Sequence, residues 1–266
     1  MLHPMVNIAV RAARSAGRIL MRNLERVDQL TVSTKTTNDF VSEVDQSAEQ
    51  AIIRELRSKF PDHAILAEES GAHDGNAYRW IIDPLDGTTN YLHGFPQFSV
   101  SIALMYRDRL EHAVVYDPLR EELFTATRGE GALLNDRKLR VSQRISLEGA
   151  LLATGIPFRE HVHLDAYLGM FRTFIAETAG IRRPGSAALD FAYVAAGRVD
   201  GFWELGLSPW DIAAGALLVQ EAGGVVSDLN GGDDYLRTGN VVSGTLKVHQ
   251  AMLKKLRPFL SDQLRV

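Results

Sequence analysis

Two carboxylates stand three residues apart, directly after a short apolar run. The stretch WIIDPLDGTTN, residues 80–90, passes from three large apolar side chains into Asp83 and Asp86. Because Pro84 has no backbone N–H, we expect it to end a central strand, with a turn at Asp83. The glycine and threonines that follow predict an exposed turn and a helix start, where backbone N–H groups attract phosphate. The stretch therefore predicts two acids beside an anion site.

Carboxylates beside a phosphate would repel it unless a cation stood between them. Hard divalent cations prefer oxygen ligands, and Mg²⁺ in proteins usually takes a few carboxylates together with water and substrate phosphate. The alternative is an Asx-type turn, in which Asp83 and Asp86 accept hydrogen bonds from the local backbone. The local sequence leaves both interpretations open.

Three further acids occupy positions from which they could join this stretch. Glu68 follows the apolar run at 64–67, Asp45 stands where a loop enters a predicted helix, and Asp211 starts another predicted helix. Each has an ordinary explanation by itself, because loop acids are commonly solvated and aspartate is a favoured residue at helix starts. Their significance depends on whether the fold brings them to Asp83.

The segments that must position these acids show first helical and then strand periodicity. Apolar residues recur at helical spacing over 5–24 and 45–60, and short apolar runs at 64–67 and 80–82 favour buried strands. A meander of three antiparallel strands is predicted over 98–106, 111–118 and 122–135. The second half predicts helices at 164–177, 186–196 and 210–222, an amphipathic stretch at 247–256, and strands at 149–154, near 181, and at 199–204, 225–226 and 241–242.

This order of elements predicts a mixed α+β fold with two sheets and covering helices. We expect one half at residues 1–146, with the first acids and an antiparallel sheet, and the other at residues 147–266, with Asp211. No long polar linker separates the halves, so we expect them to pack as one structural unit.

The composition excludes several classes of protein. The 266 residues carry a net charge of −4 and no cysteine, so we expect no direct nucleic-acid partner, no disulfide and no thiolate metal site. The N-terminal segment has arginines within its apolar pattern and predicts a folded helix, not a signal peptide. No stretch reaches the roughly 18 apolar residues of a membrane span. We expect a soluble, cytoplasmic protein without a membrane partner.

Motifs along the whole chain resemble those of the inositol monophosphatase family, and closely those of its bacterial SuhB-type branch. The first family signature is matched at 80–90, and the second by WDIAAG at 210–215 together with EAGG at 221–224. The accompanying segments are matched by EES at 68–70, GSAA at 185–188 and DGFWE at 200–204. Two separate signatures in the right order are highly specific, and no metal-ligand position departs from the family pattern.

The resemblance implies the layered α-β-α-β-α sandwich of the inositol monophosphatase and fructose-1,6-bisphosphatase superfamily, usually as a homodimer. It implies a Mg²⁺-dependent phosphomonoesterase that hydrolyses myo-inositol monophosphates and related small polyol phosphates by a two-metal mechanism with water as the nucleophile. Fructose-1,6-bisphosphatase and nucleotide 3′-phosphatase activities are the alternatives within the superfamily. Because SuhB-type relatives are associated with RNA polymerase and ribosomal RNA antitermination, a role as a partner of RNA polymerase or Nus factors is a second hypothesis. No motif in the sequence points to that role.

The resemblance also assigns roles to individual residues. It implies two Mg²⁺ ions, or three with a weaker site, and inhibition by Li⁺. The implied metal ligands are Glu68, Asp83, the backbone carbonyl of Leu85, Asp86, Asp211 and, for the weaker site, Asp45. Catalysis is implied for Glu68 and Thr88, which would orient and deprotonate the attacking water. The implied substrate contacts are Asp86, Gly87, Thr88, Gly185, Ser186, Ala187, Glu204 and Asp211.

Other polar residues are interpreted as structural. Asp233 and Asp234 follow two glycines, but the rest of a calcium-binding loop is missing, so we predict a solvated turn. His93 lies next to the first signature, yet hard Mg²⁺ sites prefer oxygen, so we expect a surface or hydrogen-bonding role. The sequence does not decide whether Arg182 and Arg183 are structural or lie at a subunit contact.

Overall fold

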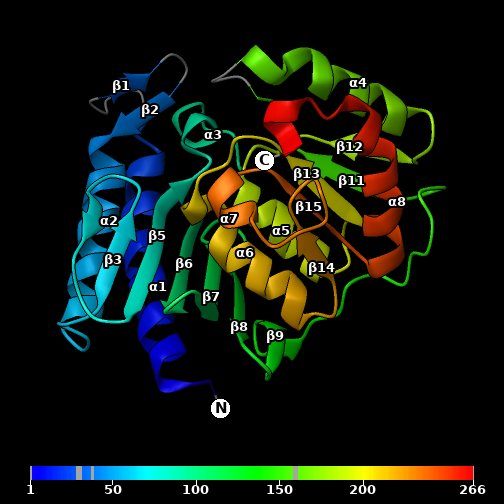
Figure 1. Cartoon of the computed structure of the whole chain (residues 1–266). Helices are drawn as coiled ribbons and strands as arrows, with labels where there is room; N and C mark the ends of the chain where they lie inside the picture. Colours follow the sequence, from blue (N-terminus) through cyan, green and yellow to red (C-terminus); the bar gives the residue numbers. More distant parts are fainter. Residues whose placement is uncertain (1, 28–31, 37–38, 158–160, 266) are drawn as a thin grey trace.

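The computed structural model describes residues 2–27, 32–36, 39–157 and 161–265, whose two larger sheets alternate with three layers of helices (Figure 1). Helices α1 (Pro4–Leu24) and α2 (Glu43–Arg57) cover the outer face of the larger sheet. Between the sheets lie α5 (Ala187–Ala195) and α6 (Pro209–Glu221), and the outer face of the smaller sheet is covered by α4 (Leu164–Ile175) and α8 (Leu246–Leu256). The predicted α-β-α-β-α sandwich is confirmed.

The larger sheet comes from the first half of the chain. Its strands are β3 (Ala64–Ala67), β4 (Gly71–His73), β5 (Tyr78–Asp86), β6 (Ser99–Tyr106), β7 (Arg109–Asp117), β8 (Glu122–Thr127), β9 (Gly131–Leu134) and β10 (Arg137–Lys138). They lie in the order β10-β9-β8-β7-β6-β5-β3-β4. Every neighbouring pair is antiparallel except β3 and β5. The carboxyl ends of these two parallel strands therefore meet at the same edge of the sheet.

The smaller sheet comes from the second half. Its strands are β11 (Leu151–Thr154), β12 (Gly180–Arg182), β13 (Gly201–Glu204), β14 (Val225–Ser227) and β15 (Val241–Gly244), in the order β12-β11-β13-β15-β14. Strand β11 is parallel to both of its neighbours, whereas β15 is antiparallel to both of its own. The predicted division of the chain between residues 146 and 147 stays a prediction, since α5 and α6 pack on both sheets.

Shorter elements complete the fold. They are β1 (Val32–Thr36) and β2 (Asp39–Ser42), which pair with each other, α3 (Thr88–Leu92), α7 (Tyr235–Thr238), and the 3-10 turns η2 (His161–His163), η3 (Arg257–Phe259) and η4 (Asp262–Arg265). The third meander segment of the sequence proves to be two strands, because β8 and β9 form a hairpin around Gly129 and Gly131.

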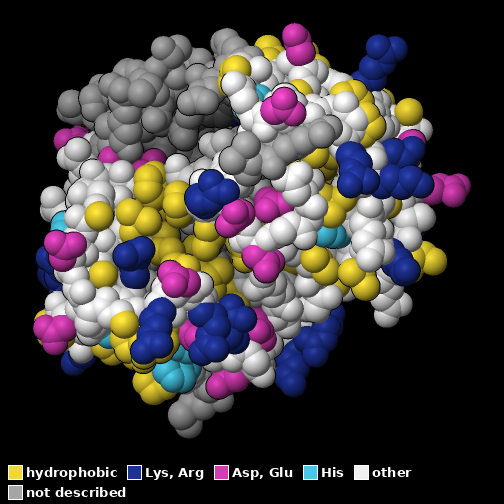
Figure 2. Space-filling model, viewed as in Figure 1, with side chains coloured by type: hydrophobic (Ala, Val, Ile, Leu, Met, Phe, Trp, Pro, Cys, Tyr) yellow, Lys and Arg dark blue, Asp and Glu magenta, His cyan; other side chains and the backbone are white. Residues whose placement is uncertain are grey.

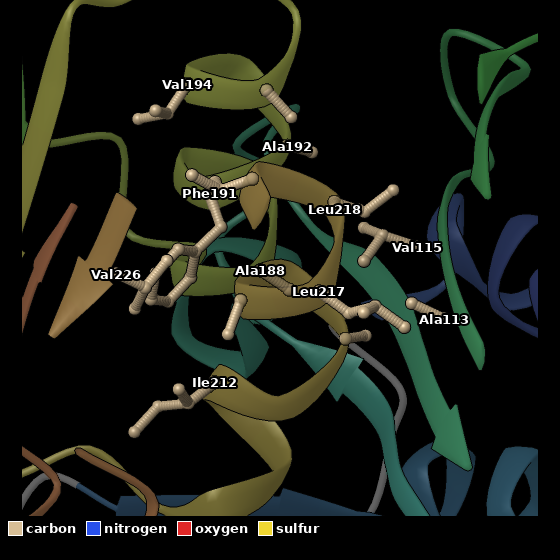
Figure 3. Close-up of a cluster of buried hydrophobic side chains, with 14 of the residues drawn as sticks. Ala113, Val115, Ala188, Phe191, Ala192, Val194, Ile212, Leu217, Leu218 and Val226 are labelled. Atoms are coloured by element: carbon tan, nitrogen blue, oxygen red, sulfur yellow. The ribbon is translucent and has the colours of Figure 1, made fainter. Parts of the chain in front are cut away.

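Helix α6 is apolar all round because it lies between two sheets. Every residue from 212 to 219 is buried, as expected of a helix without a solvent face. Figure 3 shows Leu217 of α6 and Phe191 of α5 in the same buried cluster as Ala113 of β7. A Cβ on Gly215 would lie 2.4 Å from the Cβ of Phe191, so a glycine is needed for α5 and α6 to approach this closely.

Strand β5 does not end at Asp83, so that prediction was wrong. The strand continues to Asp86, with Asp83 opposite Ser101 and Asp86 opposite Ser99 on β6. Three steps along β5 face two steps along β6, which is a β-bulge with one extra residue. Pro84 lies inside this irregularity, where the ladder is interrupted and its missing N–H breaks no regular pair.

The surface of the molecule is mixed in charge. Figure 2 shows Lys and Arg side chains intermingled with Asp and Glu over the visible face. Among the helices that the structure describes, none is long and apolar enough to cross a membrane.

Candidate functional site

The parallel pairing of β3 and β5 brings Glu68 to Asp83. Ala67 lies opposite Ile82 in this pair, and the backbone N–H of Glu68 donates to the Ile82 carbonyl at 3.1 Å. Glu68 and Asp83 therefore leave the ends of adjacent strands together, close enough for the charge of Glu68 to act on the Asp83 carboxylate. Glu68 and Asp83 are fifteen residues apart in the sequence, but they lie together because parallel strands end at the same edge.

The bulge in β5 turns Asp86 toward Asp83. In a regular strand, residues three apart point to opposite faces of the sheet. The extra residue between Asp83 and Asp86 shifts the alternation by one, so both carboxylates can face the same side. One oxygen of each, with one from Asp211, lies within 4.8 Å of the other two, and this is a group that could hold a metal ion.

Asp211 reaches the cluster from the first turn of α6. The Ser208 N–H donates to Asp211 Oδ2 at 2.7 Å, and the Ser208 side chain in turn accepts from the Asp211 backbone in a capping box. The helix-start explanation of this aspartate is therefore correct, and the same carboxylate also belongs to the converging group. Capping and metal binding are compatible in one carboxylate.

Asp86 ties the bulge to the N-terminus of α5. Its carboxylate accepts hydrogen bonds from the Ser186 hydroxyl at 2.5 Å, the Ala188 N–H at 2.8 Å and the Ala187 N–H at 3.2 Å. Asp83 Oδ1 accepts from the Leu85 N–H at 2.9 Å. The Asx-type alternative is thus realised at Asp83. Asp86 instead serves backbone N–H groups of a segment that is distant in sequence.

Burial and mutual repulsion make these carboxylates difficult to ionise together. Asp83 is 1% exposed, and its burial, followed by the charges of Glu68, Asp86 and Asp211, raises its pKa well above the ordinary value. Burial also raises the pKa of Asp86, although its hydrogen bonds from the start of α5 oppose the shift. In the described part of the chain, no lysine or arginine pairs with either aspartate. An all-oxygen donor set with surplus negative charge fits a hard divalent cation such as Mg²⁺.

Thr88 links the acidic turn to Asp45 on α2. Its hydroxyl lies 3.0 Å from the Leu85 carbonyl and 3.2 Å from Asp45 Oδ1. Thr88 begins the short helix α3, whose N-cap is Gly87 at φ 93°. A Cβ at that glycine would lie 2.9 Å from the Gln97 carbonyl, so both the backbone angle and the close approach favour glycine there.

A cavity of about 670 Å³ opens over this cluster. Of the residues predicted for the site, its wall contains Glu68, Asp83, Leu85, Asp86, Gly87, Thr88, Gly185, Ser186, Ala187, Glu204 and Asp211. Asp45 is fully buried behind the wall and reaches it through the Thr88 hydroxyl. The fold therefore brings every predicted site residue to one place, with Asp45 one hydrogen bond removed from the cavity.

The cavity also has walls that sequence reasoning did not assign. Asn90 lies in the quoted stretch, and its amide donates to the carbonyls of Gln97 and Pro184, both at 2.8 Å. This contact joins the acidic turn to the segment before α5. His93 lies on the wall and forms a 2.8 Å contact with the Thr89 carbonyl, and Arg183 also lines the cavity.

Other unassigned cavity residues carry little sequence signal. They are Ile156, Pro157, His163 and Leu205 to Leu207. Asp190 lies close to the site on α5 and is 1% exposed. Burial, then the charges of Glu204 and Asp86, raise the pKa of Asp190 well above its ordinary value. Nothing in the helical pattern marked this acidic residue as buried.

The chain is similar over nearly its whole length to known proteins. A model of the inositol monophosphatase family matches residues 1–261. Nus factor SuhB of Pseudomonas aeruginosa is 57% identical over 270 residues, which cover 99% of this chain and 100% of that protein. Nus factor SuhB of Escherichia coli K12 is 54% identical over 266 residues, with 99% and 100% covered.

A solved structure shares the fold closely. Extragenic suppressor protein suhB from Bartonella henselae matches with a TM-score of 0.94 and 47% identity, covering 96% of this chain and 99% of that one. The family match spans almost all of the sequence, and acids from both signatures line one cavity. The chain belongs to the inositol monophosphatase family.

Proposed function

We propose that the protein is a Mg²⁺-dependent phosphomonoesterase that releases phosphate from myo-inositol monophosphates and related small polyol phosphates. The observation that carries this proposal is the convergence of Asp83, Asp86 and Asp211 within 4.8 Å at the wall of an open cavity. Membership of the inositol monophosphatase family supports a phosphatase reaction. Two-metal phosphatases place such carboxylate clusters where the phosphate is attacked.

The chain's own oxygen atoms are proposed as the metal ligands. One ion would take Glu68, Asp83 and the Leu85 carbonyl, and the second would take Asp83, Asp86 and Asp211, with Asp45 near a third, weaker position. When bound, the ions supply the positive charge that lowers the pKa of the attacking water and balances charge on the leaving oxygen. Li⁺ is expected to inhibit by competing for one of these positions.

Thr88 and Glu68 are proposed to prepare the attacking water. The Thr88 hydroxyl faces two acceptors, Asp45 Oδ1 and the Leu85 carbonyl, so its proton is directed to them and its lone pairs remain to accept from a water. Glu68 is half-buried next to Asp83 and is proposed to take the water's proton. The backbone N–H groups of Gly87 and Thr88 are proposed to face the phosphate.

The polyol is proposed to lie against the second half of the chain. Gly185, Ser186, Ala187 and Glu204 line the same cavity as the acids. Glu204 packs so closely on Gly155 that a Cβ there would lie 1.7 Å from its Oε1. A carboxylate held in this way can accept hydrogen bonds from substrate hydroxyls, and such contacts distinguish one polyol from another.

Phosphate release tests the proposal. Inositol 1-phosphate, fructose 1,6-bisphosphate and a nucleoside 3′-phosphate are each incubated with the protein, with and without Mg²⁺, and with Mg²⁺ plus Li⁺. We expect Mg²⁺-dependent, Li⁺-sensitive release that favours inositol 1-phosphate. A preference for the bisphosphate or the nucleotide would keep the site and change the substrate. The absence of metal-dependent release from all three would contradict the proposal.

A second role is proposed because two relatives above half identity are named Nus factors. We propose that this chain also binds the transcription machinery, through its exterior and not through the cavity. The two roles are compatible, since they use different surfaces. A pull-down with purified RNA polymerase and Nus factors tests this role, and Asp83→Asn should leave the capture unchanged. Failure to recover any of them would contradict the partner role alone.

A further inference from the structure

A buried glutamate on α2, Glu49, holds the turn that carries Glu68. Both carboxylate oxygens of Glu49 accept backbone hydrogen bonds: Oε2 from the Glu69 N–H at 2.7 Å, and Oε1 from the Ser70 N–H at 2.9 Å. Glu49 is 2% exposed. A carboxylate is buried at this level only when its charge is satisfied by hydrogen bonds.

The turn in question joins β3 to β4 and contains three residues, Glu68 to Ser70. In a turn this tight, the N–H groups of the second and third residues have no partner in the ladder. The N–H of the first, Glu68, is held by β5 through the Ile82 carbonyl. Glu49 therefore adds a restraint from α2 on the backbone that directs the Glu68 side chain to Asp83.

The same face of α2 carries a second acidic residue that contacts the site. Asp45 stands four residues before Glu49, so both side chains lie on one face of the helix. Both are buried. Asp45 contacts the Thr88 hydroxyl at 3.2 Å, whereas Glu49 holds the residues after Glu68. One helical face thus fixes the two groups that are proposed to prepare the water.

We propose that Glu49 is a positioning residue, which fixes Glu68 for metal binding by accepting the backbone N–H groups of Glu69 and Ser70. It touches neither substrate nor metal, and it acts through the turn. The inference rests on the proposed function for the role of Glu68. Residues that orient metal ligands typically contribute about 10- to 100-fold to metal affinity or activity.

The chain offers a matched control in Glu221. Its two carboxylate oxygens also accept two backbone N–H groups of a turn, those of Gly129 at 2.8 Å and Gly131 at 2.9 Å. Glu221 ends α6, ten residues from Asp211, which is about 15 Å along the helix. Removing this second clamp tests what the loss of a carboxylate-held turn does away from the cavity.

Glu49→Gln and Glu221→Gln are compared with the wild type. Glutamine keeps one acceptor oxygen and presents an NH₂ group to the other N–H, so each variant loses one clamp bond. We expect Glu49→Gln to raise the Kd for Mn²⁺, measured by electron paramagnetic resonance, by about 10- to 100-fold. The Mg²⁺ concentration for half-maximal phosphate release should rise by the same factor. Glu221→Gln should lower the melting temperature without changing either metal constant. Equal metal constants in wild type and Glu49→Gln would overturn the inference.

Two further readouts separate this inference from the proposed function. If the wild type binds Mn²⁺ but releases no phosphate, the proposed function fails, and the Mn²⁺ constants still decide the role of Glu49. A wild type that binds no Mn²⁺ would overturn the inference. If Glu49→Gln fails to fold, hydrogen exchange of the wild type decides: slow exchange at the Glu69 and Ser70 amides is expected, and fast exchange there would overturn the clamp.

Discussion

Two acidic turns of this chain use their first aspartate in the same way. Asp83 accepts the Leu85 N–H at 2.9 Å. Asp228 accepts the N–H groups of Asn230 at 2.7 Å, Gly232 at 2.9 Å and Asp234 at 3.3 Å. Both turns are therefore Asx-type structures, and each has further acids close by in the sequence.

The turns differ in where their other acids go. Asp86 is buried and reaches α5, and Asp211 arrives from α6, so three elements direct carboxylates to one point. In the second turn the acids at 233 and 234 are exposed, and Asp234 pairs with Arg237 at 2.8 Å. Support of the backbone is thus no argument against metal binding. Convergence of carboxylates from distant segments distinguishes the two turns.

The largest expected effect is on kcat, and it should differ between variants of the two turns. Asp83→Asn removes the shared charge of the cluster, and Asp228→Asn removes the equivalent charge of the second turn. Metal ions contribute several kcal/mol to phosphoryl transfer and each 1.4 kcal/mol is about tenfold, so we expect kcat to fall about 1,000-fold in Asp83→Asn. Near-normal turnover in Asp83→Asn, or an equal loss in Asp228→Asn, would remove the distinction between the turns.

A smaller effect on rate is expected from the hydroxyl groups beside each turn. Thr88→Val should lower kcat about 100-fold, as for loss of a group that prepares the nucleophile, and Thr88→Ser should retain most activity. Ser227 is the matched control, because its hydroxyl donates to the Asp228 carbonyl at 2.7 Å. Steady-state kinetics of Ser227→Ala should match the wild type. A normal rate in Thr88→Val would exclude the proposed role of its hydroxyl.

The next effect is on stability, and here the loss is expected from the Asp228 turn. Asp228→Asn leaves backbone N–H groups of its turn with fewer acceptors, so we expect the free energy of unfolding to fall by about 1–3 kcal/mol. Its Mg²⁺ activation curve should be unchanged. Urea denaturation followed by circular dichroism measures the first quantity. A shifted Mg²⁺ curve would show that this turn, too, affects the metal site.

The smallest effect is the pH dependence of stability without metal. Burial and neighbouring acids raise the folded-state pKa of Asp83 above its ordinary value of 3.8. Its protonated form therefore favours folding at low pH, and this contribution is lost as the pH rises from about 4 through the raised pKa. In EDTA, the melting temperature of the wild type relative to Asp83→Asn should fall over this range. A difference that does not change with pH would contradict the raised pKa.

The sequence predicted most of the fold because its periodic segments are long. The helices α1, α2 and α6 lie within a few residues of their predicted bounds. Strands β4 and β10, of three and two residues, were not predicted, because they have too few positions to show alternation. The continuation of β5 through Pro84 was missed because proline ordinarily ends a central strand, and a bulge accommodates it only in the context of β6.

The residues of the site were predicted through the family resemblance and not through periodicity. The acids of both signatures came from the family resemblance, and the structure shows how β3, the bulge and α6 bring them together. Glu49 and Asp190 could not be found, because a charged residue at helical spacing resembles a solvated face. Their burial depends on partners that are distant in sequence, namely the turn after β3 and the packing of α5 between two sheets.

Asp83, Asp86 and Asp211 are proposed to hold divalent cations, whereas the Asp228 turn is expected to hold none. Crystals soaked in Mn²⁺ and measured at the manganese absorption edge test it directly. We expect anomalous peaks between these three carboxylates and between Glu68 and Asp83, with none at residues 228–234. A map without a peak at the three converging carboxylates, or with its strongest peak at the Asp228 turn, would overturn the proposed metal site.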